Sequence, residues 1–524
     1  MAEKKFFRVT EWIFAVAVMI VILVDLVLDN RFYYVCKNNC VVPNLAFFIV
    51  FLIIFTIIFF NGKIRSDKAV KAAEPGDFKV MMNVLKILTV LLFGASVYYA
   101  ALIYFETGWD CRSIVIMAQD MAFNGAHILD EHYFSLYPNN VFLTGIFAGI
   151  LIVVKSIGIK AVYFPLIIVG CLLVSLTGYF FADCVRILTG KKPLVVIFWI
   201  LYVILTGLSP WVSIPYSDTY SIFFPTFAIW LFLRKKPKSF SVSWLFITLT
   251  LFIGYFIKPT VILSFIVLLF FEIFHFFATI RSNGAGKNIL KVLLFIVVVS
   301  IGTLGAFLLR SGMERITGFE PDETRSVTPA HYFMMGLNEE YGGAYNQGDV
   351  NRSFAYETVE ERNREDMIEA GRRIISMLPV RILKFEAQKM LTNFNDGTYG
   401  WGNEGDFYWT YYEREDAPAV FLRSLVYHIG DNHDIYVAIM QGFWFITLCM
   451  CALTVLKRRD DPDYRENAIM IVMLAIMCFL TVFEARARYL YLYSPIIYMV
   501  AAVGMNRLLS LKTRTDTNEE FFDK

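Results

Sequence analysis

The sequence predicts an all-α polytopic membrane protein. Of its 524 residues, 57% are hydrophobic and only 18% are charged, a composition far more apolar than that of ordinary soluble proteins. Apolar stretches of about 17–25 residues recur along the chain, and each is long enough to cross roughly 30 Å of hydrocarbon as a helix. We count roughly thirteen of them, which predicts a bundle of roughly 12–13 transmembrane helices.

The first apolar stretch extends from Trp12 to Leu28. It is too long for the hydrophobic region of a signal peptide, and no small-residue cleavage site follows it, so we expect a retained helix. The net charge of +2 is small and dispersed, which excludes a nucleic-acid partner.

The basic residues predict the orientation of the chain. Lys4, Lys5 and Arg8 precede the first stretch, so the positive-inside rule places the N-terminus in the cytoplasm. Other basic stretches fall on the same side by this rule, at 61–79, 233–239, 281–291, 457–467 and 511–515. The loop at 106–140 is then outside, as are the stretches 209–220, 257–261, 311–434 and 484–495.

These assignments divide the chain into a membrane module at 1–310 with its first outer loop at 106–140, an extracytoplasmic segment at 311–434, C-terminal transmembrane helices at 435–510 and a cytoplasmic tail at 511–524. The extracytoplasmic segment is too long for a mere connector, because loops of this length are usually functional. Within it, residues 356–378 predict a helix with acidic residues early and basic residues late, as the helix dipole favours.

One part of this topology conflicts with itself. Three apolar stretches, near 141–157, 162–185 and 193–208, lie between two outer loops, although a return to the same side requires an even number of crossings. The first is the shortest and is followed by Lys155 and Lys160. We therefore expect that it dips part way into the membrane or lies along its surface.

The outer loop at 106–140 contains the sequence "TGWDCRSIVIMAQDMA". Its apolar residues Ile114, Met117, Ala118 and Met121 recur at helical spacing, which predicts an amphipathic helix on the outer membrane surface. Asp110 stands at the beginning of this helix. Spacing alone favours a helix N-cap for Asp110, since aspartate commonly accepts a hydrogen bond from a free helix N–H; a chemical role is the alternative.

Further polar residues occur at the outer ends of other predicted helices. They include Asp218 in "YSDTY" and Glu484, Arg486 and Arg488 in "EARARY". Charges at this depth are costly and usually functional, so together they indicate a water-filled cavity. The alternative for each residue alone is a snorkelling arginine or an interfacial aromatic side chain.

The order of these short motifs, "WD", "YPNN", "SP", "YSDTY", "KP" and "RARYLY", resembles the polyprenyl-phosphate-dependent GT-C glycosyltransferases. That superfamily includes protein O-mannosyltransferases, the aminoarabinose transferase and bacterial cell-envelope sugar transferases. The resemblance covers roughly 100–260 and 480–500. It implies a GT-C-like bundle with an amphipathic juxtamembrane helix in the first long outer loop and one larger extracytoplasmic segment.

The resemblance also implies a reaction. A monosaccharide moves, with inversion, from a polyprenyl-phosphate-linked sugar donor to a hydroxyl of a glycan, lipid or protein acceptor, at the outer face of the cell membrane. Asp110 stands where the family has its general base. The substrate-binding residues are expected to be Arg112, Tyr137, Asn139, Asp218, Lys258, Glu484, Arg486 and Arg488. No cofactor is expected and no metal, because the first loop lacks a convincing Asp-x-Asp pair.

The two arginines near the C-terminus are expected to have different partners. Glu484 lies four residues before Arg488, a spacing that pairs the two side chains on one face of a helix. That pairing leaves Arg486 to bind the donor phosphate, which a planar guanidinium suits because it engages two phosphate oxygens at once.

Other functions agree less well with the sequence. The six histidines lack the spacing of a structural zinc site, and neither a Walker loop nor a dinucleotide-binding glycine motif is present. A polysaccharide polymerase or ligase acting on lipid-linked glycans is a second possibility, and a lipid or solute transporter is a third, weakened by the absence of an internal repeat. Cys36 and Cys40 form either a local disulfide or two unpaired thiols; the sequence favours neither.

Overall fold

The computed structural model describes residues 2–28, 41–61, 78–127, 131–235, 242–283, 286–319, 322–405, 407–456 and 463–511. Cys36 and Cys40, most of the basic stretches used for orientation, and nearly all of the tail at 511–524 lie outside these residues.

The described residues are mainly helical, and ten of their helices are long and apolar enough to cross a membrane. These are α1 (Ala2–Val27), α2 (Val41–Phe60), α5 (Phe78–Leu102), α8 (Asn139–Ser156), α9 (Tyr163–Thr189), α14 (Ile262–Asn283), α15 (Gly286–Thr317), α21 (His433–Ala452), α22 (Tyr464–Val482) and α23 (Tyr489–Leu509). Shorter apolar helices complete the bundle: α10 (Lys192–Tyr202) with the π-helical turn η2 (Val203–Gly207), α12 (Phe223–Arg234) and α13 (Ser243–Ile257). The predicted all-α polytopic membrane fold is confirmed.

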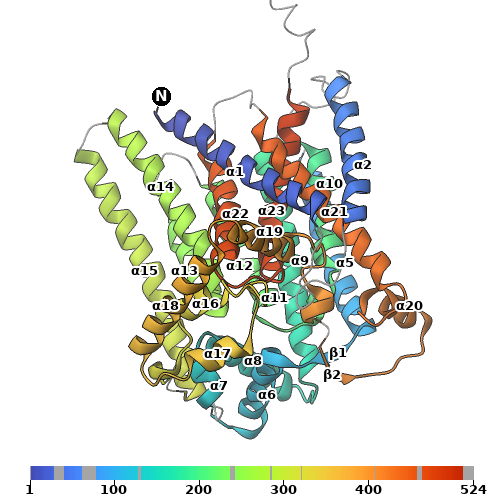
Figure 1. The fold of residues 1–524 in the computed structure, drawn as a ribbon, viewed down its shortest axis with the longest axis vertical. Helices are drawn as coiled ribbons and strands as arrows, with labels where there is room; N and C mark the ends of the chain where they lie inside the picture. Colours follow the sequence, from blue (N-terminus) through green and yellow to red (C-terminus); the bar gives the residue numbers. More distant parts are fainter. Residues whose placement is uncertain are drawn as a thin grey trace, which may run out of the picture.

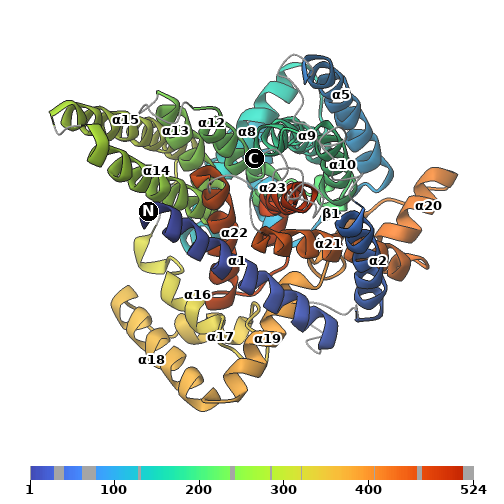
Figure 2. The same cartoon turned by 90° about the horizontal axis from the view of Figure 1, so that it is seen from above.

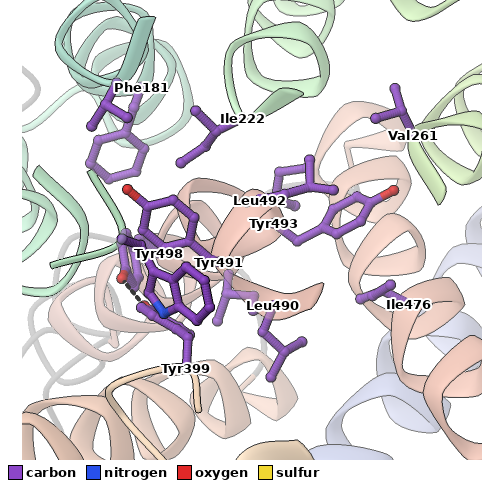
Figure 3. Packing of buried hydrophobic residues seen from close by; sticks show 14 of the residues in the cluster. Phe181, Ile222, Val261, Tyr399, Ile476, Leu490, Tyr491, Leu492, Tyr493 and Tyr498 are labelled. Carbon is purple, nitrogen blue, oxygen red and sulfur yellow. Dashed lines mark hydrogen bonds between the residues drawn. The ribbon is translucent and has the colours of Figure 1, made fainter. Parts of the chain in front are cut away.

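Helix α23 forms the centre of the bundle, with other helices on every side (Figure 2). Its residues Tyr491, Tyr493 and Tyr498 are buried among apolar side chains from α9, α22 and the neighbouring loops (Figure 3). Each buried hydroxyl has a partner, as burial requires: Tyr491 donates to the Thr206 carbonyl over 3.3 Å, Tyr493 donates to the Thr260 carbonyl over 2.5 Å, and Tyr498 lies 2.9 Å from the Thr206 hydroxyl. The aromatic C-terminal stretch is therefore the core of the protein rather than an interfacial belt.

The two ends of the bundle differ. At one end, Arg507 near the end of α23 pairs with Glu11 of α1 over 2.7 Å. At the other end lie α6 (Trp109–Asn124), α7 (Glu131–Leu136) and a two-stranded antiparallel sheet of β1 (Phe105–Thr107) and β2 (Tyr408–Tyr411) (Figure 1). We call this second end the loop end. The sheet joins the loop at 106–140 directly to the long segment at 311–434.

Helix α8 does not carry the chain to the opposite end, although its length and composition would allow a crossing. Its first turn contacts α7, where Asn140 donates a hydrogen bond to Tyr133, and its last turn reaches the end of α6, where Lys155 donates to the Phe123 carbonyl. Seven residues after α8 ends, the first residue of α9, Tyr163, accepts a hydrogen bond from the Thr107 backbone at the loop end. The chain thus leaves and returns to the same end, which agrees with the expectation for the stretch 141–157.

The segment at 311–434 begins within α15 and contains α16 (Pro329–Met335), α17 (Gln347–Ser353), α18 (Val359–Met377), α19 (Arg381–Phe394), the π-helical turn η6 (Trp401–Gly405) and α20 (Ala417–Val426). Helix α18 confirms the helix predicted at 356–378, and Thr358 caps it through a hydrogen bond from the Glu361 backbone. Helix α19 then runs inward, so that residues 391–401 are buried in the bundle. Part of the predicted outer segment is therefore core.

Candidate functional site

Asp110 lies in the first turn of α6 and does not cap it. The N-cap is Gly108, which provides no side chain, and the following Trp109 has a left-handed φ of 45°. The residues predicted for the apolar face of this helix are buried, which confirms that face, and they pack against α8. The N-cap interpretation of Asp110 was wrong, because the helix begins at Trp109, two residues earlier than an Asp110 N-cap would require. Strained backbone such as that at Trp109 is held in place by surrounding contacts and often marks functional sites.

The half-buried Asp110 carboxylate has neutral partners. Tyr216, which precedes the short helix α11 (Ser217–Ser221), donates a hydrogen bond to Oδ2 of Asp110 over 3.2 Å. Burial and then the Asp110 charge raise the pKa of Tyr133, whose ring lies on α7. Within the described residues no lysine or arginine pairs with Asp110. Asp110 therefore lacks the cationic partner that the other carboxylates of the site have among the described residues.

A second carboxylate, Asp218, holds two buried cations. Nζ of Lys258 donates to its Oδ1 over 2.6 Å, and Nε of Arg488 lies 3.3 Å from its Oδ2. Lys258 follows the end of α13, and Arg488 precedes α23. Burial, assisted by the charge of Arg488 and opposed by that of Asp218, lowers the pKa of Lys258 to about 8. The structure thus brings together Asp218, Lys258 and Arg488, three of the residues expected at the outer ends of helices.

The partners predicted for the two arginines were wrong. Arg486, not Arg488, pairs with Glu484, over 2.6 Å, and it also donates to Glu404 over 2.7 Å. The sequence argument assumed a continuous helix, whereas α22 ends at Val482 and α23 begins at Tyr489. In the non-helical link the spacing of four residues no longer sets a common face. Burial alone would raise the pKa of Glu484, but its bonds to Arg486 and Tyr489 lower it below the usual range.

Arg488 lies between Asp218 and the aromatic side chains next to Asp110. Its guanidinium lies 4.7 Å from the centre of the Trp109 ring and 5.5 Å from that of Tyr216, the residue bonded to Asp110. Among the described residues Arg488 donates no hydrogen bond, although it is buried and flanked by Asp218 and by Glu404 at 3.8 Å. Its donors thus remain available for a ligand.

Unsatisfied polar atoms gather around this guanidinium. Two are donors, Nε1 of Trp109 and Nε of Arg488, and two are acceptors, Oδ2 of Asp218 and Oε1 of Glu404, all buried without a hydrogen bond. Nε of Arg488 and Oδ2 of Asp218 face each other as an ion pair at 3.3 Å. Buried groups of this kind are uncommon in folded proteins and require a partner such as water or a ligand. Because both donors and acceptors lack hydrogen bonds, the site suits a ligand that has hydroxyls as well as a negative charge.

Lys389 fixes the link that contains Glu484, Arg486 and Arg488. It is buried on α19 and donates to the carbonyls of Thr481 over 2.6 Å and Phe483 over 2.9 Å, where α22 ends, and to that of Gly336 over 2.7 Å. A cation at a helix C-terminus is favourable, since the free carbonyls carry partial negative charge. The long segment therefore positions the two arginines as well as providing Glu404.

The structure does not bring all the predicted residues to this cluster. Arg112 stacks on Trp409, 3.7 Å from its ring centre, and Asn139 bonds only to its neighbour Asn140 within the described residues. Tyr137 stands nearer, and burial together with the Asp110 charge raises its pKa. Trp109, Tyr216 and Glu404 were not predicted as site residues, since aromatic residues are abundant here and Glu404 is one of many acids in its segment.

A family model described as a conserved hypothetical integral membrane protein matches residues 4–509. The chain belongs to this family. Its membrane-spanning helices agree with that description, which names no reaction or substrate. A search of curated proteins gave no match. The function of the site is therefore inferred from its chemistry.

Proposed function

We propose that the protein is an inverting glycosyltransferase of the GT-C type. It moves a monosaccharide from a polyprenyl-phosphate donor to a hydroxyl of a glycan, lipid or protein acceptor at the outer face of the membrane. The observation that supports this best is the division of charge in the site. Asp110 has no cationic partner among the described residues, whereas Lys258 and Arg488 are buried cations that pair with Asp218, and Arg488 also lies against Tyr216, which bonds to Asp110.

In this reaction Asp110 takes the proton of the acceptor hydroxyl as that oxygen attacks C1 of the donor sugar. The bond from C1 to the phosphate oxygen breaks at the same time, and the phosphate leaves with the electron pair. General-base catalysis requires a carboxylate that is not neutralised by a nearby cation, which Asp110 satisfies. Charge developing on the leaving phosphate requires fixed cations in a dry site, which Lys258 and Arg488 satisfy.

Asp218 has a different role in this proposal. Before the sugar donor binds, the buried cations Lys258 and Arg488 would repel each other, and a buried charge without a partner is costly. Asp218 holds Lys258 on one oxygen and faces Arg488 with the other, so it keeps both cations in place until the phosphate arrives. Glu404 and Glu484 hold Arg486 in the same way, which makes Arg486 a positioning residue and Arg488 the better phosphate ligand.

The test is turnover of defined donors. Purified protein in lipid nanodiscs is incubated with radiolabelled polyprenyl-phosphate hexoses and pentoses, and loss of label from the lipid is measured. We expect turnover with one donor and none from an Arg488→Met variant that retains the wild-type melting profile. Binding of a donor without turnover would favour a transporter, and in sealed liposomes that labelled donor would instead cross the membrane intact.

A further inference from the structure

The turn between α18 and α19 exposes a group of apolar side chains. Ile375, Leu378, Val380 and Leu383 are 73%, 56%, 71% and 71% exposed. Pro379 between them is exposed as well. We call residues 375–383 the hairpin tip. Soluble surfaces rarely present so many large apolar side chains together, and such patches usually mark an interaction site.

Charge is divided along this hairpin. The sequence around the tip, "RRIISMLPVRILK" at 372–384, contains four basic residues and no acid, whereas the first half of α18 is rich in glutamate. Arg373 is engaged by Asp349 and Glu369, and Arg381 pairs with Glu339. Arg372 is 67% exposed with only a long contact to Glu369, and Lys384 is exposed. The tip is thus apolar with a basic border.

The hairpin lies beside the bundle rather than beyond its end. Figure 2 shows α18 and α19 outside the ring of long helices, and in Figure 1 they are level with those helices. Helix α19 packs against α1 and α22, two of the helices that qualify as membrane spans. A side chain that points away from the bundle at this level faces the region that lipid occupies around the spans.

We propose that the hairpin tip is seated in the lipid bilayer, in the leaflet at the loop end, with its basic border on anionic headgroups. An apolar surface bordered by lysine and arginine is the pattern of segments that lie in the membrane interface. A soluble protein partner does not fit as well, because α1 and α22 place the base of α19 against membrane-spanning helices. The inference is independent of the glycosyl transfer proposed above.

The experiment uses the full chain in vesicles of phosphatidylcholine and phosphatidylglycerol. An environment-sensitive fluorophore is attached at Val380→Cys, or at Arg364→Cys as the matched control on the charged part of α18, where the side chain is 69% exposed. Cys36, Cys40 and the exposed Cys478 are replaced by serine in both proteins. Quenching by lipid with a nitroxide on its acyl chain is compared with quenching by aqueous iodide.

We expect the label at 380 to be blue-shifted, quenched by the nitroxide lipid and protected from iodide, with the reverse at 364. Quenching of both labels by iodide alone would overturn the proposal, since the tip would then lie in water. Protection of position 380 from both quenchers would also overturn it, because another protein surface would cover the tip. Replacing Arg372 and Lys384 by glutamine should weaken the nitroxide quenching in anionic vesicles; unchanged quenching would refute the role of the basic border.

Discussion

Replacing Asp110 by asparagine separates the catalytic role of this carboxylate from any structural one. Asparagine has nearly the same shape and still offers an oxygen to the hydroxyl of Tyr216, which is 3.2 Å from Oδ2 in the native protein. It also remains compatible with the first turn of α6. What the substitution removes is the capacity to accept a proton.

The expected loss of stability in Asp110→Asn is much smaller than the expected loss of catalysis. A charged acceptor contributes about 1.5–3 kcal/mol to a hydrogen bond and a neutral one about 0.5–1.5 kcal/mol, so the free energy of unfolding should fall by about 1 kcal/mol. Loss of the negative charge near the helix N-terminus adds about 0.3–1 kcal/mol. Loss of a general base should lower kcat by about 10²–10⁴-fold, which corresponds to roughly 3–5 kcal/mol in the barrier.

The assay measures kcat with the donor that the turnover experiment selects, and the melting temperature of the same preparation. Asp218→Asn is the matched control, because Asp218 holds Lys258 and Arg488 and breaking a buried ion pair costs about 3–5 kcal/mol. We expect Asp110→Asn to lose activity with a nearly native melting temperature, and Asp218→Asn to lose stability. Full activity in Asp110→Asn, or the same loss of stability in both variants, would refute the assignment of Asp110 as the base.

Three further predictions follow from the same contacts. Arg488→Lys should raise the donor KM by roughly ten-fold, the equivalent of one charge-assisted hydrogen bond, whereas Arg486→Lys should mainly lower the melting temperature. A larger rise in KM for Arg486→Lys than for Arg488→Lys would contradict the assignment of Arg488 as the phosphate ligand. Because its pKa is lowered to about 8, Lys258 should lose its charge above that pH and the donor KM should rise, while Lys258→Arg should show no such rise. Lys389→Met should destabilise the protein by about 3 kcal/mol, measured by thermal unfolding, since three carbonyls lose their donor.

The sequence by itself determined the class of fold and the local elements. Hydropathy and helical periodicity depend on residues close together in the chain, so they identified the membrane helices, the buried face of α6 and the charge pattern of α18. The order of short polar motifs also brought Asp110, Asp218, Lys258 and Arg488 into one hypothesis. Each of these residues stands near the end of a predicted helix, and helix ends on the same side of a membrane meet at the same surface.

Only the tertiary structure decided how the charges pair. Glu404 binds Arg486 across 82 residues of sequence, and no local pattern distinguishes Glu404 from the other acids in its segment. The assignment of Arg486 and Arg488 failed because it extended helical spacing through a link that Lys389 holds in another conformation. Ion pairs and hydrogen bonds depend on where distant backbones meet, and that is set by the packing of the whole bundle around α23 rather than by any residue's neighbours in the chain.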